Sequence, residues 1–307
     1  MIDENSPKFL KGKIDKQAQR ISELINRPYK NTTEFKRILK ANIEDAMQIT
    51  DKTVKDFVAK EIRQEWAKGE YQASKEIPKE SRKPIPPKIA KEKVSKLINN
   101  TYVEISSKSR LAYKQTWDSI NKILKKTTAA TPMTKVRDLV KERLTAKNIT
   151  TVHYKGRKAV PLSVYSEMIA RTSRTETFNT ASIEYAKRNT DLVYIPSIFP
   201  TCEICIMYQD RVYSISGNSD KYPALYETAF GNGYETIHPN CRHRAVPYME
   251  ELQNVDELER NRKQSNRPFA DTRTIKNKRE YQEWQEKNRK AHERAMAKVE
   301  KPIEAEQ

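Results

Sequence analysis

Residues 34–66 read EFKRILKANIEDAMQITDKTVKDFVAKEIRQEW. Apolar side chains recur through this stretch at steps of three and four residues: Phe35, Ile38, Leu39, Ile43, Ala46, Met47, Val54, Phe57, Val58, Ile62 and Trp66. That spacing is typical of an amphipathic α-helix with one buried face. Because residues 31–33 (NTT) offer capping side chains just before it, we expect a long helix to begin here.

The same periodicity predicts three more helices, over residues 89–124, 134–146 and 162–188. The first of them is separated from the opening helix by a stretch that contains four prolines: Pro78, Pro84, Pro86 and Pro87. Proline lacks a backbone N–H and fixes its own φ, so this stretch is expected to be an extended, semi-rigid linker. A charged helix is expected near the C-terminal end, over residues 276–301.

Strand signals occur only in the second half of the chain. Two short β-type segments flank Lys155-Gly156-Arg157 and predict a hairpin over residues 149–160. A strand is expected over 192–199, and a strand with a turn over 208–217. His153 lies in the first hairpin segment with no partner motif nearby, so we interpret it as structural or exposed.

These patterns predict an α+β protein with a mostly α-helical N-terminal half, a small β-containing Cys/His module in the C-terminal half, and a helical basic tail. We divide the chain into an N-terminal helical region (1–75), a Pro-rich linker (76–88), a second helical region (89–147), a hairpin-helix and Cys/His module (148–250), and a charged tail (251–307) that is partly helical or disordered.

The composition is unusual for an enzyme. Of the 307 residues, 36% are hydrophobic and 33% are charged, which is typical of long solvated helices around a thin core. Glycine occurs only 6 times, fewer than enzymes with Gly-rich cofactor loops usually need. We therefore expect a non-enzymatic protein.

The net charge is +18, from 59 Lys and Arg against 41 Asp and Glu. Such a charge attracts polyanions and suits sequence-independent contact with DNA phosphates. The alternative is that Lys-rich helices simply keep the protein soluble, since no recognised nucleic-acid motif accompanies the charge.

The chain shows neither a signal peptide nor the run of about 20 apolar residues that spans a bilayer. We expect no membrane partner and a protein made and kept in a reducing cytoplasm. The three cysteines are an odd number, which argues against a complete disulfide framework.

All three cysteines lie in one short region and point to a local metal site. Cys202 and Cys205 form a C-x-x-C pair, and residues 238–243 (HPNCRH) add His238, Cys241 and His243. Two such pairs can supply a tetrahedral nitrogen and sulfur shell, which Zn²⁺ favours. We expect Cys202, Cys205, His238 and Cys241 to hold a structural zinc, with His243 as the alternative fourth ligand or an outer-shell group.

Two other interpretations of the cysteines stay open: reduced thiols that only pack in the core, and a redox dithiol. A full protein shell favours a structural over a catalytic metal, because hydrolytic zinc keeps a position open for water. Between the two pairs, residues 222–226 (YPALY) anchor an excursion with little apolar content of its own, so a metal closing this long loop would offset its poor core.

Upstream of the module, Arg171, Thr175 and Glu176 lie near one another on the predicted helix over 162–188, and Asn179 lies one turn further on. We expect these polar groups to brace the helix against the cysteine module. A catalytic Arg–Glu pair is the alternative.

The chain resembles the phage minor capsid protein 2 family across about residues 150–250. The resemblance is carried by residues 154–157 (YKGR), 165–168 (YSEM), 171–172 (RT), Gly217, 222–227 (YPALYE), 240–243 (NCRH) and Pro247. The C-x-x-C pair with residues 238–242 is also similar to the wider Mu F-like head morphogenesis proteins of tailed phages. That wider group usually ends its motif in Cys where this chain has His243, and minor capsid 2 members often lack the C-x-x-C pair.

The resemblance implies a minor protein of the phage head that acts with portal, major capsid or scaffold proteins during procapsid assembly and contacts packaged DNA. It implies a place in the virion, in the capsid interior or at the portal vertex, after assembly in the host cytoplasm. A metal-dependent nuclease of the His-Asn-His class is the alternative, suggested by His238, Asn240 and His243 on a basic protein. That class needs an earlier Asp-His pair, which the chain lacks.

Overall fold

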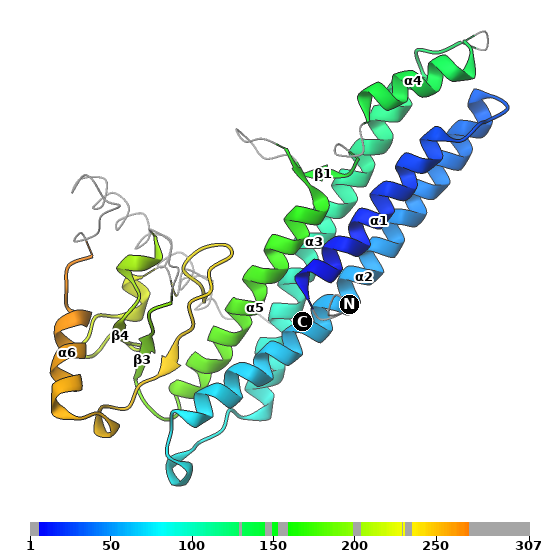
Figure 1. Ribbon diagram of the computed structural model, residues 1–307. Coiled ribbons are helices and arrows are strands. Elements are labelled where there is room, and N and C mark those ends of the chain that lie inside the picture. The colour runs from blue at the N-terminus through cyan, green and yellow to red at the C-terminus, as the bar shows by residue number, and fades with distance from the viewer. Residues whose placement is uncertain are drawn as a thin grey trace, which may run out of the picture. The chain divides into compact units, whose positions relative to one another are not determined.

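The computed structural model describes residues 6–128, 131–144, 149–152, 159–198, 204–228, 230 and 235–269. These residues form a mostly helical α+β protein whose short strands all lie in the second half of the chain, as the sequence predicts (Figure 1). The predicted tail helix over 276–301 lies outside the described residues. Among the helices within those ranges, none is long and apolar enough to cross a bilayer.

The described helices are α1 (Pro7–Asn26), α2 (Thr32–Lys75), α3 (Pro87–Leu124), α4 (Met133–Arg143), α5 (Leu162–Ala186) and α6 (Val255–Ser265). The helices predicted over 34–66, 89–124, 134–146 and 162–188 are confirmed as α2, α3, α4 and α5. Helix α2 continues beyond Trp66 because the small buried residues Gly69 and Ala73 extend its inner face.

Helices α1 and α6 begin at side-chain caps. The hydroxyl of Ser6 accepts a hydrogen bond from the Lys8 N–H at the start of α1, and Asn254 accepts one from the Glu257 N–H at the start of α6. Helix α1 ends before Pro28, since proline disfavours helical geometry in the residue that precedes it.

The strands are β1 (Thr151–Val152), β2 (Val160–Pro161), β3 (Leu192–Ile195), β4 (Arg211–Ser214) and β5 (Val246–Pro247). The pairing of β1 with β2 is antiparallel, as expected for the predicted hairpin, whereas its turn, with His153, lies outside the described residues. The other strands form an antiparallel sheet in the order β4-β3-β5. Strand β3 stops four residues earlier than predicted, because Pro196 cannot donate to the sheet.

Contacts between Cα atoms divide the chain into two compact units. The first unit comprises Met1–Glu61 and Lys96–Arg171, and the second comprises Ile62–Ser95 and Thr172–Gln307. Each unit combines segments that are distant in sequence, whereas the five regions predicted from composition are consecutive. The boundaries of those five regions stay a prediction, because they follow sequence composition and the two units follow contacts in space.

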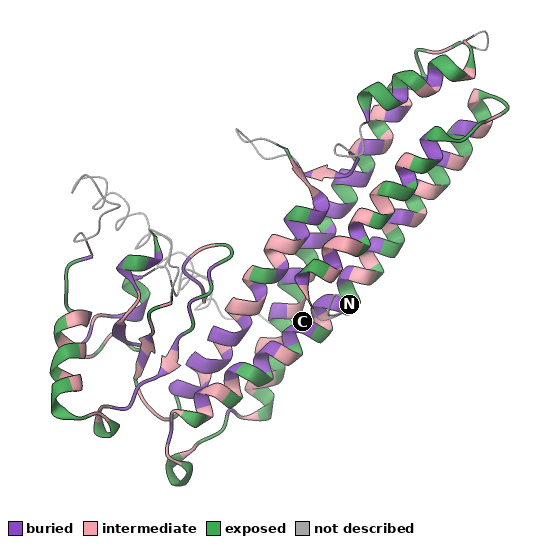
Figure 2. Cartoon of the chain, viewed as in Figure 1, coloured by how far each residue is buried: buried purple, intermediate pink, exposed green. Residues whose placement is uncertain are grey.

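In the first unit, α1, α2 and α3 pack through buried apolar stripes, which alternate with exposed residues along each helix (Figure 2). Polar contacts set the register between α2 and α3. The hydroxyls of Thr50 and Tyr113 lie 2.8 Å apart in the core, and the Ser106 hydroxyl donates to the Asp51 carboxylate at 2.6 Å. Buried polar groups that find such partners avoid the cost of desolvation without a hydrogen bond.

In the second unit, α5 packs against the end of α2 through an ion pair and a close backbone approach. The Arg174 guanidinium lies 2.8 Å from the carboxylate of Glu65, which is 2% exposed. Burial raises the pKa of Glu65, but hydrogen bonds from Lys68 and Arg174 outweigh that effect and leave the pKa below its ordinary value. One turn further along α2, Gly69 faces the backbone of α5 at Phe178.

Replacement of Gly69 with Ala is expected to destabilise the protein by about 1–3 kcal/mol. The added Cβ would lie 2.5 Å from the Phe178 carbonyl oxygen, which is backbone and cannot rotate away. Gly12→Ala is the matched control, because beyond its own helix backbone and chain neighbours nothing lies within 4 Å of its added Cβ; we expect it to stabilise α1 by about 0.5–1 kcal/mol. Urea denaturation measures both changes, and equal stability of the two variants would contradict the packing argument.

Candidate metal-binding site

Three of the five predicted site residues come together in the second unit. The Sγ of Cys205 lies 3.0 Å from Nε2 of His238 and 3.7 Å from Sγ of Cys241. The three ligand atoms all lie within 4.8 Å of one another, so the cluster can hold a metal ion. Cys202, the other half of the C-x-x-C pair, lies outside the described residues.

A tight turn explains the spacing of His238 and Cys241. The Cys241 N–H donates to the His238 carbonyl at 3.0 Å, which closes a four-residue turn. Pro239 occupies the second position of this turn and Asn240, with φ of 63°, the third; both residues suit a type II turn. The turn therefore brings the imidazole and the thiol of an H-x-x-C motif to the same metal-sized space.

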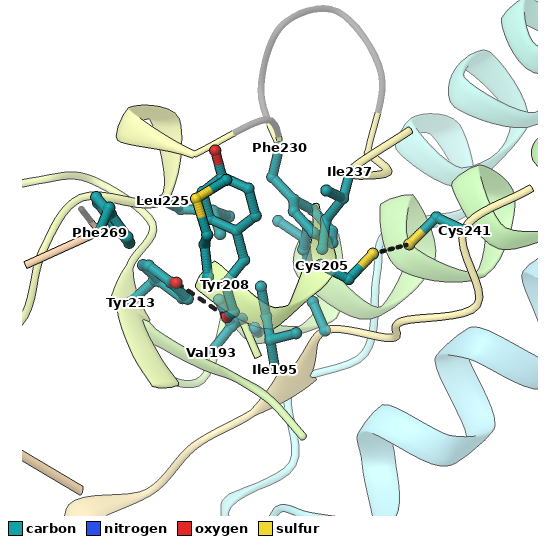
Figure 3. Close-up of a cluster of buried hydrophobic side chains, with 14 residues drawn as sticks. Val193, Ile195, Cys205, Tyr208, Tyr213, Leu225, Phe230, Ile237, Cys241 and Phe269 are labelled. Atoms are coloured by element: carbon teal, nitrogen blue, oxygen red, sulfur yellow. Dashed lines mark hydrogen bonds between the residues drawn. The ribbon is translucent and has the colours of Figure 1, made fainter. Parts of the chain in front are cut away.

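Cys205 begins a 3-10 turn, Cys205–Met207, that enters a core of buried side chains. Figure 3 shows Cys205 and Cys241 at one edge of this core, beside Phe230 and Ile237. Leu225 and Phe230 come from the segment expected to have little apolar content, and both are buried. This segment therefore adds buried apolar side chains to the core, although Tyr226 beside them stays 40% exposed.

His243 is buried beside the cluster and outside the group of three ligands. Its Nδ1 lies 3.6 Å from Sγ of Cys241, and its Nε2 lies 2.8 Å from Oε1 of Gln209. The backbone N–H of Gln209 donates to the Cys205 carbonyl at 3.1 Å. The residue whose side-chain amide contacts His243 is therefore held by the turn that carries Cys205. No signal in the sequence identified Gln209, because its role depends on a residue 34 positions away.

The thiol of Cys241 has a pKa well below its ordinary value. The hydrogen bond with Cys205 is the largest cause, burial of the sulfur raises the pKa, and hydrogen bonds with His243 lower it further. One of these is donated by the His243 backbone N–H at 3.4 Å. The site therefore favours the thiolate, the form of cysteine that binds metals.

Helix α5 holds the backbone of the motif through one face. The Thr175 hydroxyl donates to the Cys241 carbonyl at 2.8 Å, and the Asn240 N–H donates to the Thr172 hydroxyl at 3.1 Å. These contacts fix the turn that positions His238 and Cys241.

Asn179 makes the most extensive of these contacts, and its side chain is fully buried. Its Nδ2 donates to the carbonyls of Glu235 at 2.7 Å and His243 at 3.1 Å, and its Oδ1 accepts from the Ala245 N–H at 3.0 Å. The Ser182 hydroxyl adds a bond to the Ala245 carbonyl at 2.7 Å. The backbone groups of residues 235, 243 and 245 thus form hydrogen bonds with side chains on one face of α5 instead of with a neighbouring strand.

The predicted brace is confirmed for Thr175 and Asn179. Arg171 takes another partner: it forms an ion pair with Glu167, one turn earlier on α5, at 2.5 Å. Ser182 also belongs to the brace and is absent from the predicted set, although its position three residues after Asn179 places it on the same helical face.

Comparison with known proteins supports the resemblance that these residues suggest. The profile of the family described as Phage minor capsid protein 2 matches residues 17–307, which include the whole site. The chain belongs to the phage minor capsid protein 2 family. Membership gives the protein a structural role in a phage particle.

A relative of this minor capsid protein is described as "Structural protein" of Lactococcus phage LL-H. It is 24% identical over 161 residues, which are 50% of this chain and 43% of the relative. The match thus spans less than half of that protein's own length. No solved structure matches the minor capsid chain.

Proposed function

We propose that this minor capsid protein is a non-enzymatic head morphogenesis component of a tailed phage. It would bind portal, major capsid or scaffold proteins during procapsid assembly in the host cytoplasm, then remain in the capsid interior or at the portal vertex. Contact with packaged DNA, independent of sequence, is part of the proposal. The match of the family over residues 17–307 carries it, because that match covers both the helical part and the Cys/His module.

We propose further that one structural Zn²⁺ is held by Cys202, Cys205, His238 and Cys241. In a tetrahedral centre with Zn–S bonds of about 2.3 Å, two thiolate sulfurs lie about 3.8 Å apart. The separation of 3.7 Å between the Cys205 and Cys241 sulfurs fits that edge. The 3.0 Å between Cys205 and His238 is shorter than the corresponding edge of about 3.6 Å, so zinc would widen this pair slightly.

We propose His238 as the histidine ligand. Its Nδ1 lies 2.6 Å from the Pro239 carbonyl and, as a donor there, leaves the lone pair of Nε2 for a metal. In most zinc-bound histidines the other ring nitrogen likewise donates to an oxygen of the protein or of water. His243 is proposed as an outer-shell group, because its Nε2 contacts Gln209 and its backbone N–H donates to the Cys241 sulfur. With Cys202, the shell is closed to water, which suits a structural metal.

The geometry does not favour the nuclease alternative. A nuclease of the His-Asn-His class needs a histidine that can reach a water molecule and a phosphate. His243 is only 3% exposed, and both of its ring nitrogens face protein atoms. His238 is half-buried, and its two ring nitrogens contact the Cys205 sulfur and the Pro239 carbonyl.

Co-expression with the portal, major capsid and scaffold proteins of the same phage tests the assembly role. We expect a tagged chain to retain at least one of them through affinity purification and gel filtration, with an unrelated basic helical protein as the control. Failure to retain any head protein, in pairwise and combined expression, would overturn the proposed role.

A further inference from the structure

One end of the first unit is built from two connections. The turn from α1 to α2 meets the start of α4, where the Thr32 hydroxyl lies 3.7 Å from Sδ of Met133. The Arg137 guanidinium donates to the Arg27 carbonyl at 3.5 Å. Figure 1 shows the α1–α2 turn and α4 at the same end of this unit. We call residues 27–37, 122–128 and 131–143 the basic end.

The basic end carries eleven Lys and Arg residues and three acidic residues. Four of the basic residues flank the α1–α2 turn: Arg27, Lys30, Lys36 and Arg37. The end of α3 and its extension supply three more: Lys122, Lys125 and Lys126. Helix α4 supplies the last four: Lys135, Arg137, Lys141 and Arg143. The resulting net charge of +8 is a large part of the +18 of the whole chain.

Among the described residues, no ion pair joins any of these basic side chains to an acidic group. Ten of the eleven are exposed, and Arg137 is half-buried. Within the part of the chain that the structure describes, ion pairs of the first unit involve other basic residues, such as Lys11 with Asp15, Arg20 with Asp45 and Arg110 with Asp51. Clustered like charges repel one another, so a polyanion would relieve a repulsion that the fold itself leaves in place.

The two aromatic rings of the basic end pack against each other. Phe35 is fully buried, and Tyr29 packs edge-on against it with ring centroids 5.0 Å apart. The Tyr29 hydroxyl donates to the Leu24 carbonyl at 2.6 Å. Because Phe35 is buried and the half-buried Tyr29 ring packs against it, the surface offers mainly flexible cations, which suit phosphates better than single-stranded bases.

We infer that the basic end is a binding surface for the phosphate backbone of double-stranded DNA. The inference rests on the proposed contact with DNA and assigns that contact to the helical first unit. Binding of this kind should give an affinity for DNA that is independent of sequence and falls steeply with salt, since each neutralised phosphate releases counterions.

The test compares two triple variants of the full-length protein by fluorescence anisotropy with a labelled 30-base-pair duplex. One variant replaces Lys122, Lys125 and Lys126 with Gln. The matched control replaces Lys52, Lys55 and Lys60 of α2 with Gln. These lysines are also exposed and lie in the same unit, so the control variant loses the same amount of charge. Binding is measured between 50 and 200 mM salt, and circular dichroism checks that both variants remain folded.

For the Lys122, Lys125 and Lys126 variant, we expect the slope of log K against log salt to become shallower by about 2.7, or about 0.9 for each lost phosphate contact. Its affinity at 100 mM salt should fall at least about 10-fold, while the control stays within about 2-fold of the parent. Two duplexes of unrelated sequence should bind equally.

Two results would overturn the inference. Equal losses in the two variants would show that only net charge matters and that the basic end is no particular site. Absence of duplex binding by the parent would overturn both this inference and the DNA contact in the proposed function. The assembly role is tested separately by co-purification with head proteins, so the two failures are distinguishable.

Discussion

Replacement of Cys241 with Ser is expected to abolish zinc binding and to loosen the loop that the site closes. A serine hydroxyl stays protonated at neutral pH and is a poor zinc ligand, whereas the Cys241 thiol has a strongly lowered pKa. Losing this ligand should weaken zinc binding by more than the factor of about 10–100 that outer-shell changes cost. Metal binding is coupled to folding, so the melting temperature should fall as well.

Elemental analysis of protein purified under reducing conditions measures the metal directly. We expect one zinc per chain in the parent and none after Cys205→Ser, Cys241→Ser or His238→Ala. His243→Gln is the matched comparison, since an outer-shell group can be replaced with partial retention of zinc. Loss of zinc from His243→Gln with full retention in His238→Ala would reverse the assignment of the two histidines.

A second measurement covers the case in which a cysteine variant does not fold. Treatment of the parent with a chelator should lower its melting temperature, and added Zn²⁺ should restore it. A parent that contains no zinc and shows no response to either treatment would contradict the metal proposal and leave the thiols as packing residues.

Replacement of Asn179 with Ala is expected to destabilise the protein by about 3–5 kcal/mol. The amide satisfies three backbone groups of the segment over 235–245, including the His243 carbonyl and the Ala245 N–H. A buried backbone group left without a partner costs about 1–3 kcal/mol, and this substitution orphans at least two. Zinc affinity should fall too, because the same segment carries His238 and Cys241.

Asn99→Ala is the control for this prediction, because it removes the same atoms from an exposed position of α3 and should change stability by less than about 0.5 kcal/mol. Denaturant unfolding followed by circular dichroism measures both variants. Similar stability of Asn179→Ala and Asn99→Ala would show that water replaces the amide and that α5 does not brace the motif.

The helices and the local halves of the site could be predicted from the sequence. Apolar steps of three and four residues determine a helix within one or two turns, so α2 was recognised from residues 34–66 alone. The H-x-x-C pair is local for the same reason: Pro239 and Asn240 favour the turn that places His238 and Cys241 together. The part of α2 beyond Trp66 was not predicted, because Gly69 and Ala73 on its buried face have no large apolar side chain to continue the pattern.

The assembly of the site depended on contacts between residues far apart in the chain. Cys205 meets His238 across 33 positions, and Asn179 meets His243 across 64. No periodicity encodes such pairs, because they form only after the intervening loop has closed and its apolar residues, such as Phe230, have entered the core.

The sequence by itself determined a mostly helical chain, a basic charge and a set of Cys and His residues spaced to share a metal. Only the tertiary structure decided which histidine faces Cys205, and which helix face holds the motif in place. The physical reason is that spacing along the chain identifies only the candidate ligands. Ligand orientation instead follows from buried hydrogen bonds, such as those of Gln209 and Asn179, that exist only in the packed protein.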